Sequence, residues 1–396
     1  MADKLTKSFV DAVGEAEQLI TSAAHVRTAQ DLAEGYDYLA GSIQASLRMA
    51  WAYQRDWPFF VQSTGPYTKL GLDNPDTLYL HAYLRDDTEY VVTGRRGTTT
   101  DLSFQVLNGD YSPVEVPDSL TAFDDRNIEI AADGSFELRF GPPRPGARRN
   151  FVPLGPDAAM LAVREVYSDW GAERRGTLRI HRADTIGAAP PPVDEALMAK
   201  RYGVAGKILL SRLKTFLAFP EWFYLREPVN TLTTPRRTPG GLATQFSSAG
   251  HFDLSQDQAM IVTVPVAGKA VAPYQGIQLG SMWYVSLDYI NHQTSLTADQ
   301  ARIDVDGMLR FVISERNPGV ANWLELTGRS RGYVQLRWQR LTRDLGSADG
   351  PAVRVVPFAD LALALPYYGH ARITAAEYAT RIAMRQAAVA ERMVGC

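Results

Sequence analysis

The segment from Ser286 to Gln293 gathers the side chains best suited to acid/base chemistry, with six hydrogen-bonding side chains in eight positions. Alternate residues of a strand share one face, so a strand here would place Asp288 and His292 beside Ser286. A carboxylate and an imidazole on one face can exchange protons with a substrate without a cofactor. The sequence therefore predicts Asp288, His292 and Tyr289 as catalytic residues.

Other aromatic and polar residues are predicted to contact the substrate. Trp283 and Tyr284 come directly before the acid/base segment and would supply an apolar wall. Asn322 and Arg337 would orient a substrate oxygen through hydrogen bonds. The predicted substrate-contacting residues are Trp283, Tyr284, Asn322, Trp323, Arg337 and Asp76.

The sequence contains no recognisable metal motif. Its six histidines are scattered and form no H-x-x-x-H pair. The single cysteine, Cys396, ends the chain, so we expect neither disulfides nor thiolate ligands. We therefore expect no metal; a site assembled from residues on distant strands is the alternative.

Several short motifs are more typical of turns than of sites. Acidic clusters at 86–89 and 124–129 lie between predicted strands, where alternation splits the carboxylates across two faces. Spaced glycines with arginines at 94–97 and 328–332 suit hairpin turns better than a phosphate cradle. The stretch 247–253 contains serine, histidine and aspartate but no G-x-S-x-G elbow. Since nucleotide-binding motifs are also missing, we expect no cofactor.

The overall composition excludes several classes of partner. The 396 residues carry 41 Lys and Arg against 44 Asp and Glu, a net charge of −3, which gives no general attraction to nucleic acid. No apolar run approaches the roughly 20 residues of a membrane span. The N-terminal region carries charges throughout and lacks the apolar core of a signal peptide, so we expect a cytoplasmic protein.

These candidate residues must be positioned mainly by β-strands. Between about residues 78 and 187, and again between about 222 and 368, apolar residues alternate with polar ones and turn signals are frequent. Many short strands separated by turns are typical of a sandwich or jelly roll. Helical spacing is confined to the first 55 residues, a segment after the Ala188–Val193 linker, and the C-terminus.

The ends of these helices are predicted as well. Thr28 and Asp31 would cap a helix that stops before Pro58. Asp194 would cap a helix that ends before Pro220. The last helix would begin with a capping box over Thr374–Glu377.

The two strand-rich halves repeat one another with an offset of 172 or 173 residues. The paired landmarks are Gln105 and Gln278, Asp133 and Asp306, Asn150 and Asn322, and Arg164 and Arg337. Four landmarks in one order at nearly one offset indicate tandem duplication. Residues present in both halves are typical of scaffold, which is the alternative for Asn322 and Arg337. Asp288 and His292 lack evident counterparts in the first half.

These patterns predict a mainly β protein with accessory α-helices, built from tandem duplicated jelly-roll or β-sandwich lobes. The predicted divisions are a helical segment 1–57, a first lobe 58–187, a linker and helix 188–221, a second lobe 222–370 and a C-terminal helix 371–396.

The second lobe resembles the uncharacterised family called domain of unknown function twelve-fourteen. The motifs that carry this resemblance are Trp283–Tyr289, Ser295–Arg302, Asp306-Gly307, Asn317–Gly328 and Arg337-Trp338. The first lobe, with Asn74–Thr77 and Gly94–Gly97, is similar to the family's N-terminal companion, domain twelve-fifty-four. The resemblance implies tandem jelly-roll-like domains, trimeric in some members, and implies no particular activity.

We therefore expect a cofactor-independent enzyme of lyase, isomerase or hydratase type that acts on a hydrophobic small molecule such as an isoprenoid, steroid or aromatic metabolite. The Asp288–His292 pair and the missing nucleotide and metal motifs favour this hypothesis. The alternative is a non-catalytic protein that binds a hydrophobic ligand or assembles into oligomers, because duplicated jelly rolls suit oligomeric shells. Whether the protein forms a homo-oligomer is left open.

Overall fold

The computed structural model describes residues 4–146, 149–237 and 245–393, and Cys396 lies outside them. The chain forms two compact units. Unit 1 comprises Met1–Leu70, Leu78–Glu165 and Arg174–Ala218, and unit 2 comprises Gly71–Thr77, Val166–Glu173 and Phe219–Cys396. Two short segments from the first half of the sequence, 71–77 and 166–173, therefore belong to the second unit.

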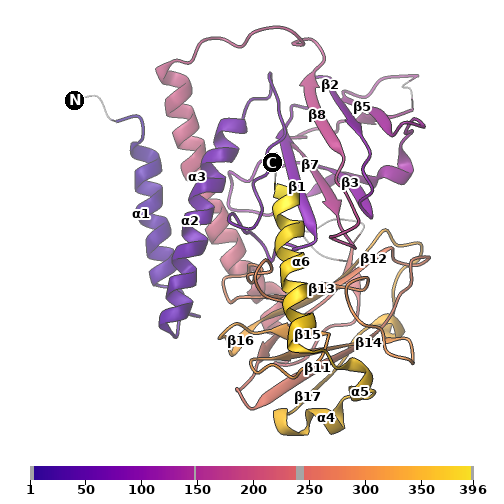
Figure 1. Ribbon diagram of the computed structural model, residues 1–396. Helices are drawn as coiled ribbons and strands as arrows, with labels where there is room; N and C mark the ends of the chain where they lie inside the picture. The colour runs from indigo at the N-terminus through magenta and orange to yellow at the C-terminus, as the bar shows by residue number, and fades with distance from the viewer. Residues whose placement is uncertain (1–3, 147–148, 238–244, 394–396) are drawn as a thin grey trace. The chain divides into compact units, whose positions relative to one another are not determined.

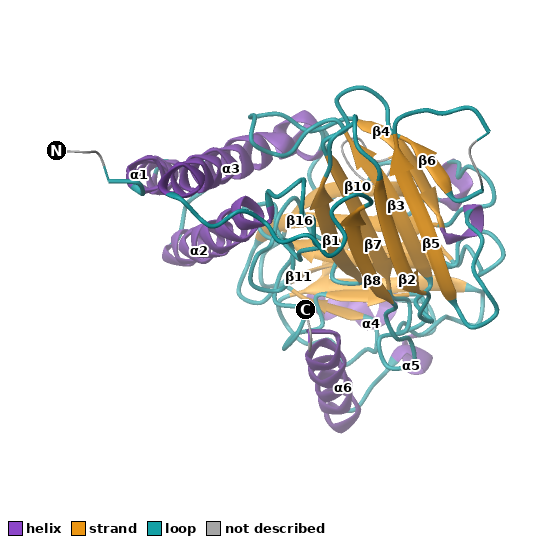
Figure 2. Cartoon of the chain, turned by 90° about the horizontal axis from the view of Figure 1, so that it is seen from above, coloured by secondary structure: helices purple, strands orange, loops and turns teal. Residues whose placement is uncertain are grey.

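Three long helices lie side by side in Figures 1 and 2: α1 (Lys7–Thr21), α2 (Ala29–Ala52) and α3 (Glu195–Trp222). The capping box predicted for α2 is confirmed, because Thr28 Oγ1 accepts from the Asp31 amide and Asp31 Oδ2 from the Thr28 amide, both at 3.0 Å. Asp194 caps α3 as predicted, accepting from the Leu197 amide at 2.8 Å. The predicted end of α3 before Pro220 is wrong. Proline stands in the last turn of the helix, where it removes a single amide donor.

Unit 1 contains a β-sandwich of two four-stranded sheets, with the orders β1-β7-β3-β4 and β6-β5-β2-β8. The strands are β1 (Thr77–Tyr83), β2 (Tyr90–Arg95), β3 (Asp101–Leu107), β4 (Ser119–Asp124), β5 (Ser135–Gly141), β6 (Phe151–Pro153), β7 (Met160–Val166) and β8 (Thr177–Arg182). Alternate residues of both sheets face one core, which contains Phe104, Leu138 and Val163.

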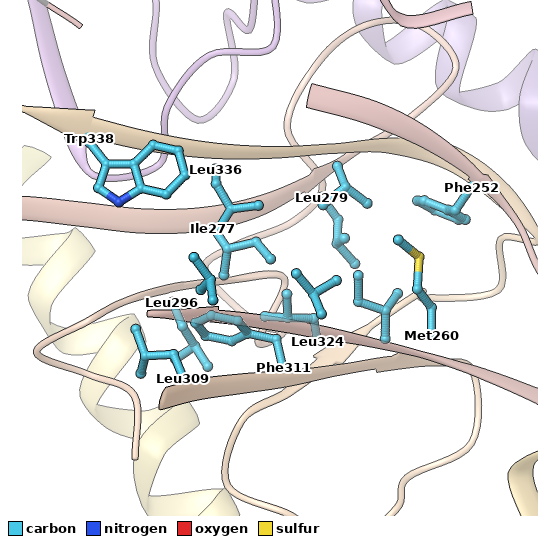
Figure 3. Close-up of a cluster of buried hydrophobic side chains, with 14 of the residues drawn as sticks. Phe252, Met260, Ile277, Leu279, Leu296, Leu309, Phe311, Leu324, Leu336 and Trp338 are labelled. Atoms are coloured by element: carbon cyan, nitrogen blue, oxygen red, sulfur yellow. The ribbon is translucent and has the colours of Figure 1, made fainter. Parts of the chain in front are cut away.

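Unit 2 contains a second sandwich, with the sheet orders β13-β12-β16-β10-β9 and β15-β14-β11-β17. The strands are β9 (Arg236–Arg237), β10 (Phe246–Asp253), β11 (Gln258–Pro265), β12 (Tyr274–Gly280), β13 (Ser295–Thr297), β14 (Met308–Ser314), β15 (Trp323–Glu325), β16 (Arg331–Gln339) and β17 (Ala352–Pro357). Figure 3 shows the core between the two sheets, where Ile277, Leu279 and Leu336 approach Leu309 and Phe311.

Three helices follow the second sandwich: α4 (Leu361–Ala364), α5 (Tyr368–Ala371) and α6 (Ala375–Met393). The capping box predicted for α6 is confirmed. The Thr374 amide donates to Glu377 Oε2 at 2.7 Å, and the Glu377 amide donates to Thr374 Oγ1 at 3.2 Å. No helix in the described part of the chain combines the length and the apolar composition that crossing a membrane requires.

The two sandwiches share one strand order, as duplication predicts. The order β1-β7-β3-β4 corresponds to β10-β16-β12-β13, and β6-β5-β2-β8 corresponds to β15-β14-β11-β17. In both lobes a short strand pairs in parallel with its predecessor, β6 with β5 and β15 with β14. The predicted fold class, mainly β with accessory helices and tandem sandwich lobes, is confirmed.

Candidate functional site

The segment Ser286–Gln293 does not form the predicted strand. Ser286 makes an isolated β-bridge, and a turn follows it. The Asp288 carboxylate accepts hydrogen bonds from two following backbone amides, at 3.0 and 3.1 Å, a local pattern that competes with strand pairing. The prediction that Asp288 and His292 share a strand face with Ser286 is therefore wrong.

His292 is instead paired with Glu325. Its Nδ1 lies 2.9 Å from Oε2 of Glu325, and the imidazole is 43% exposed while the Glu325 side chain is 14% exposed. The other carboxylate oxygen accepts from the Gln293 amide at 2.8 Å and from the Tyr378 hydroxyl. Because an ionised carboxylate can only accept, Nδ1 carries a proton. In the neutral ring Nε2, which bonds no described residue, is then the proton acceptor.

Trp323 and Tyr378 support this pair from β15 and α6. Their rings lie 5.4 Å apart, centroid to centroid, and the Trp323 indole donates to the Ser314 carbonyl at 3.0 Å. Burial, followed by the hydrogen bond to Glu325, raises the pKa of Tyr378. Its hydroxyl therefore stays protonated and donates to Glu325 at neutral pH.

The other predicted aromatic residues are buried. Trp283 is 1% exposed, and Tyr284 and Tyr289 are each 4% exposed. Tyr284 adopts a φ of 57°, and its hydroxyl lies 3.2 Å from the hydroxyl of Tyr224. Burial raises the pKa of Tyr284 well above its ordinary value, so its hydroxyl is neutral. The Tyr289 ring meets the ring of Trp170 at 6.2 Å, nearly edge to face.

Asn322 makes the contacts of a scaffold residue. Its side-chain amide donates to the carbonyls of Arg302 and Arg310, at 2.7 and 3.1 Å, and its oxygen accepts from the Arg302 amide at 2.7 Å. Asn150 makes the same three bonds to the equivalent backbone positions of the first lobe. The shared pattern explains why both copies retain the residue.

Arg337 is likewise matched in the first lobe. Arg337 donates to Gln278, and Arg164 donates to Gln105 at 2.8 Å. Arg337 additionally donates to the Leu72 carbonyl at 2.5 Å and is 6% exposed. Both duplicated landmarks therefore hold backbone or sheet side chains together within their own unit.

Asp76 lies inside a polar network of unit 2 and is 1% exposed. Its carboxylate accepts from the Trp170 indole and from the Tyr274 hydroxyl, both at 2.7 Å. Burial raises the pKa of Asp76, while these hydrogen bonds and the charges of Arg392 and Arg385 oppose the rise. Trp170 also lines a pocket of unit 2. Its hydrogen bond to Asp76 therefore holds one wall of that pocket in place.

A pocket of about 290 Å³, called the α6 pocket here, opens beside α6 in unit 2. Its volume is near the lower end of small-molecule sites, which span roughly 300–1,000 Å³. The lining residues are Asp169, Trp170, Gly171, Gln293, Leu296, Asp299, Gln300, Arg381, Met384 and Arg385. Gln293 connects this pocket to the His292–Glu325 pair, because its amide donates to Glu325 while its side chain lines the pocket.

Arg381 places cationic donors in the α6 pocket. Its Nη1 donates to the Ala321 carbonyl at 2.8 Å and to Gln293 Oε1 at 3.3 Å. Its Nε and Nη2 bond no described residue, and the side chain is partly buried. Burial lowers the pKa of Arg381, and the nearby charge of Arg302 lowers it further. Even so, a guanidinium remains charged at neutral pH.

Arg385 and Trp170 form the rigid back of the pocket. Arg385 is 5% exposed and donates to the carbonyls of Tyr289 and Ser295, at 3.0 and 2.9 Å. Burial lowers the pKa of Arg385 to about 10. Its guanidinium carbon lies 4.5 Å from the Trp170 ring centroid, and that of Arg392 lies 4.4 Å from the same ring. The indole is therefore fixed by two cation–π contacts and by Asp76.

Two carboxylates border the α6 pocket. Asp299 forms an ion pair with Lys269, which offsets its charge. Asp169 is exposed, and its Oδ1 accepts from the amides of Gly171 and Ala172 at 2.9 and 3.2 Å. Among the described residues no group of three or more histidine, cysteine, aspartate or glutamate side chains could hold a metal ion. The positive charges of the pocket come from Arg385, which is buried, and Arg381, which is partly buried.

Sequence reasoning missed Trp170, Glu325, Arg381 and Arg385. The C-terminal helix itself was predictable, and Tyr378, Arg381, Arg385 and Arg392 recur at three, four and seven residues, which places them on one helical face. The shared face of these four residues could therefore have been predicted from the sequence. No spacing rule, however, predicts that residues near 170, 293 and 385 lie around one pocket.

Of the predicted residues, Tyr289 and Asp76 both contact Trp170 at the back of the pocket. His292 and Trp323 belong to the neighbouring Glu325–Tyr378 network. Asp288 lies at the start of the turn that precedes that network. Trp283, Tyr284, Asn322 and Arg337 are not among the residues that line the α6 pocket.

The chain matches no protein-family model and no curated protein sequence. It is similar to the solved structure of an uncharacterised protein from Burkholderia cenocepacia, with a TM-score of 0.80 and 29% identity over 90% of this chain and 98% of that chain. It also matches the VPA0106 protein from Vibrio parahaemolyticus, with a TM-score of 0.46 and 14% identity over 87% of this chain and 100% of that chain. The likeness to the Burkholderia protein extends over both lobes.

Proposed function

We propose that unit 2 binds a small organic anion in the α6 pocket. The observation that carries this proposal is the Arg381 guanidinium, which lines the pocket with Nε and Nη2 free of described partners. These two nitrogens form the edge of the guanidinium that binds a carboxylate in a bidentate manner. The proposed ligand therefore carries a carboxylate.

The rest of the pocket suits a short apolar body. Leu296 and Met384 supply apolar lining, and Trp170 supplies an aromatic wall that two arginines and Asp76 hold in place. A pocket of about 290 Å³ accommodates one ring or a short chain rather than a steroid. The ligand class is thus narrower and more polar than the hydrophobic metabolite expected from the sequence.

The test is calorimetric titration of the full chain with benzoate and with benzamide, its uncharged analogue. We expect binding of benzoate and weaker or undetectable binding of benzamide. Arg381→Ala should weaken benzoate binding by at least tenfold, or about 1.4 kcal/mol, because it removes the charge-assisted pair. Arg381→Lys should recover part of the loss.

Arg316→Ala is the charge-matched control. Arg316 is a surface arginine of the same unit, 57% exposed and paired with Asp257. Its replacement should leave benzoate affinity unchanged. Equal affinities of wild type and Arg381→Ala, or equal affinities for benzoate and benzamide, would reject the proposed site.

A second proposal is that His292 acts as an acid/base group, which keeps the cofactor-independent lyase, isomerase or hydratase as the candidate reaction class. The supporting observation is the Nδ1 contact of 2.9 Å to Glu325, which orients the ring and directs Nε2 away from the carboxylate. A histidine oriented by a carboxylate is a common arrangement for proton transfer.

The acid/base proposal predicts a specific tautomer of His292. Nitrogen-15 NMR of the imidazole should show the Nδ1–H form at pH values where the ring is neutral, because Glu325 accepts that proton. Glu325→Gln should weaken this preference, since a neutral amide accepts less strongly. A dominant Nε2–H tautomer in the wild type would contradict the proposal.

Three expectations from the sequence remain predictions. They are the resemblance to domain of unknown function twelve-fourteen, the cytoplasmic location and the possible formation of a homo-oligomer.

A further inference from the structure

The α6 pocket carries a carboxylate that the proposed function does not use. Asp169 lines the pocket and is exposed, so it lies at the mouth. One of its carboxylate oxygens, Oδ1, accepts from the amides of Gly171 and Ala172, at 2.9 and 3.2 Å. The other oxygen, Oδ2, bonds no described residue. It can therefore accept a hydrogen bond from a ligand.

The space beside this carboxylate is open. Gly171 also lines the pocket. Apart from its neighbours in the chain, a Cβ added at Gly171 would meet only one atom within 4 Å, which is Asp169 Oδ1 at 3.5 Å. A ligand in the pocket can therefore approach Asp169 from the side of Gly171.

The second carboxylate of the pocket is already neutralised. Asp299 forms an ion pair with Lys269. The Lys269 ammonium also donates to the Ser168 hydroxyl and to the Pro273 carbonyl, at 3.3 and 3.2 Å, so its three donors are used within the protein. Asp169, by contrast, forms no ion pair with any described residue.

Arg381 carries the matching positive charge on the inner side of the pocket. Its guanidinium donates to the Ala321 carbonyl and to the side-chain oxygen of Gln293, both of which are neutral groups. Arg381 and Asp169 line the same pocket but form no ion pair with each other. The pocket therefore presents two opposite charges, and the protein itself pairs neither of them with the other.

The carboxylate that acts on Arg381 from the same helix is engaged elsewhere. Burial and the charge of Arg302 lower the pKa of Arg381, and the charge of Glu377 raises it. Glu377 accepts from the amide and the hydroxyl of Thr374, at 2.7 and 2.8 Å, in the capping box of α6. It forms no ion pair with Arg381, which leaves the free edge of that guanidinium available to a ligand.

One helical turn and one aromatic ring stand between the two charges. Arg385 follows Arg381 by one turn of α6, and its guanidinium carbon lies 4.5 Å from the ring centroid of Trp170. Trp170 directly follows Asp169 in the chain. A ligand that reaches both charges is therefore expected to hold its own charges apart on a ring or a short chain, unlike an α-amino acid, which carries both on one carbon.

We infer that the α6 pocket takes a small amino acid whose ammonium group is separated from its carboxylate, an inference that rests on the proposed function. The carboxylate binds Arg381, as proposed above, and the ammonium binds Asp169. Each ligand charge then meets one opposite charge of the protein. Because Asp169 is exposed, the ammonium keeps part of its hydration and its desolvation costs little. Asp169 is thus the residue that distinguishes an amino acid from a simple acid.

The test compares 4-(aminomethyl)benzoate with 4-methylbenzoate by calorimetric titration of the full chain at pH 7. The two probes share the ring and the carboxylate and differ in the ammonium group. Asp169→Asn should lower the affinity for 4-(aminomethyl)benzoate by roughly two- to fivefold, the factor that an exposed ion pair typically adds. The affinity for 4-methylbenzoate should not fall.

Asp169→Asn removes the charge and retains the local turn. Asparagine keeps a side-chain oxygen that can accept from the amides of Gly171 and Ala172, so the midpoint of thermal unfolding should match that of the wild type. Asp253→Asn is the matched control, because Asp253 is an exposed aspartate at the end of β10 whose carboxylate bonds no described residue. Its replacement should leave the affinities for both probes unchanged.

Two results would overturn the inference. One is that 4-(aminomethyl)benzoate binds wild type and Asp169→Asn equally or binds neither of them. The other is that Asp169→Asn lowers the affinity for both probes by the same factor. In either case, benzoate binding that depends on Arg381 would leave the proposed function intact. Failure of benzoate and of both probes to bind the wild type would reject the proposed function and this inference together.

Discussion

Asp76 illustrates how single residues in unit 2 are controlled by burial. The sequence gives an aspartate in an Asn-Pro-Asp-Thr turn, whereas the fold places it 1% exposed between an indole and a phenol donor. Both donors belong to residues far away in sequence, Trp170 and Tyr274. Burial is the largest influence on its pKa and raises it. The carboxyl therefore titrates differently in the folded and unfolded chains.

This difference predicts a pH dependence of stability. A raised folded-state pKa favours folding while Asp76 is protonated, so the contribution is fully present below the ordinary pKa of 3.8. It is lost as the pH rises through the raised value. Asp76→Asn should flatten the corresponding fall in the free energy of unfolding, measured by urea denaturation across acidic pH. Parallel pH profiles for both proteins would contradict this account.

At the same scale, sequence reasoning found some residues and missed their partners. It singled out His292 by residue type, and the structure pairs that ring with Glu325 rather than with Asp288. Asp288 could not be assigned correctly because its carboxylate bonds the amides that follow it and ends the strand pattern. Local alternation predicts which face a strand residue takes only where a strand forms.

At the scale of elements, α6 is attached to unit 2 mainly through long polar side chains. Tyr378, Arg381, Arg385 and Arg392 lie on one face of the helix and reach a carboxylate, backbone carbonyls and the Trp170 ring. The capping box at its start was readable from the sequence. The surface of unit 2 that α6 packs against could not be predicted from the sequence, because arginines in a helix are usually solvated.

Arg385 is the residue of α6 whose replacement should cost the most stability. It is buried and donates to the Tyr289 and Ser295 carbonyls and to the Ser295 hydroxyl. Arg385→Met should lower the free energy of unfolding by about 3 kcal/mol, because it leaves buried acceptors unpaired.

The measurement is urea unfolding followed by fluorescence. Thr380→Ala, at an exposed position of the same helix, is the control and should change stability by less than about 0.5 kcal/mol. A loss no larger for Arg385→Met than for Thr380→Ala would show that α6 does not depend on this contact.

At the scale of the whole molecule, duplication gives each lobe the same strand order and the same Asn and Arg–Gln contacts. These features were predictable because a repeat conserves the pairs that hold a sheet together. The differences between the copies were not predictable. In unit 2, segment 71–77 lies on the sheet and accepts hydrogen bonds from Arg337 and Gln278 through its Leu72 and Asp73 carbonyls.

The most direct test of the α6 pocket is a crystal structure of the full chain grown with benzoate. The benzoate carboxylate should lie within about 3 Å of Nε and Nη2 of Arg381. The benzoate ring should contact Leu296 or Met384, both of which line the pocket. An α6 pocket that holds only water in crystals saturated with benzoate would show that Arg381 does not bind a carboxylate there.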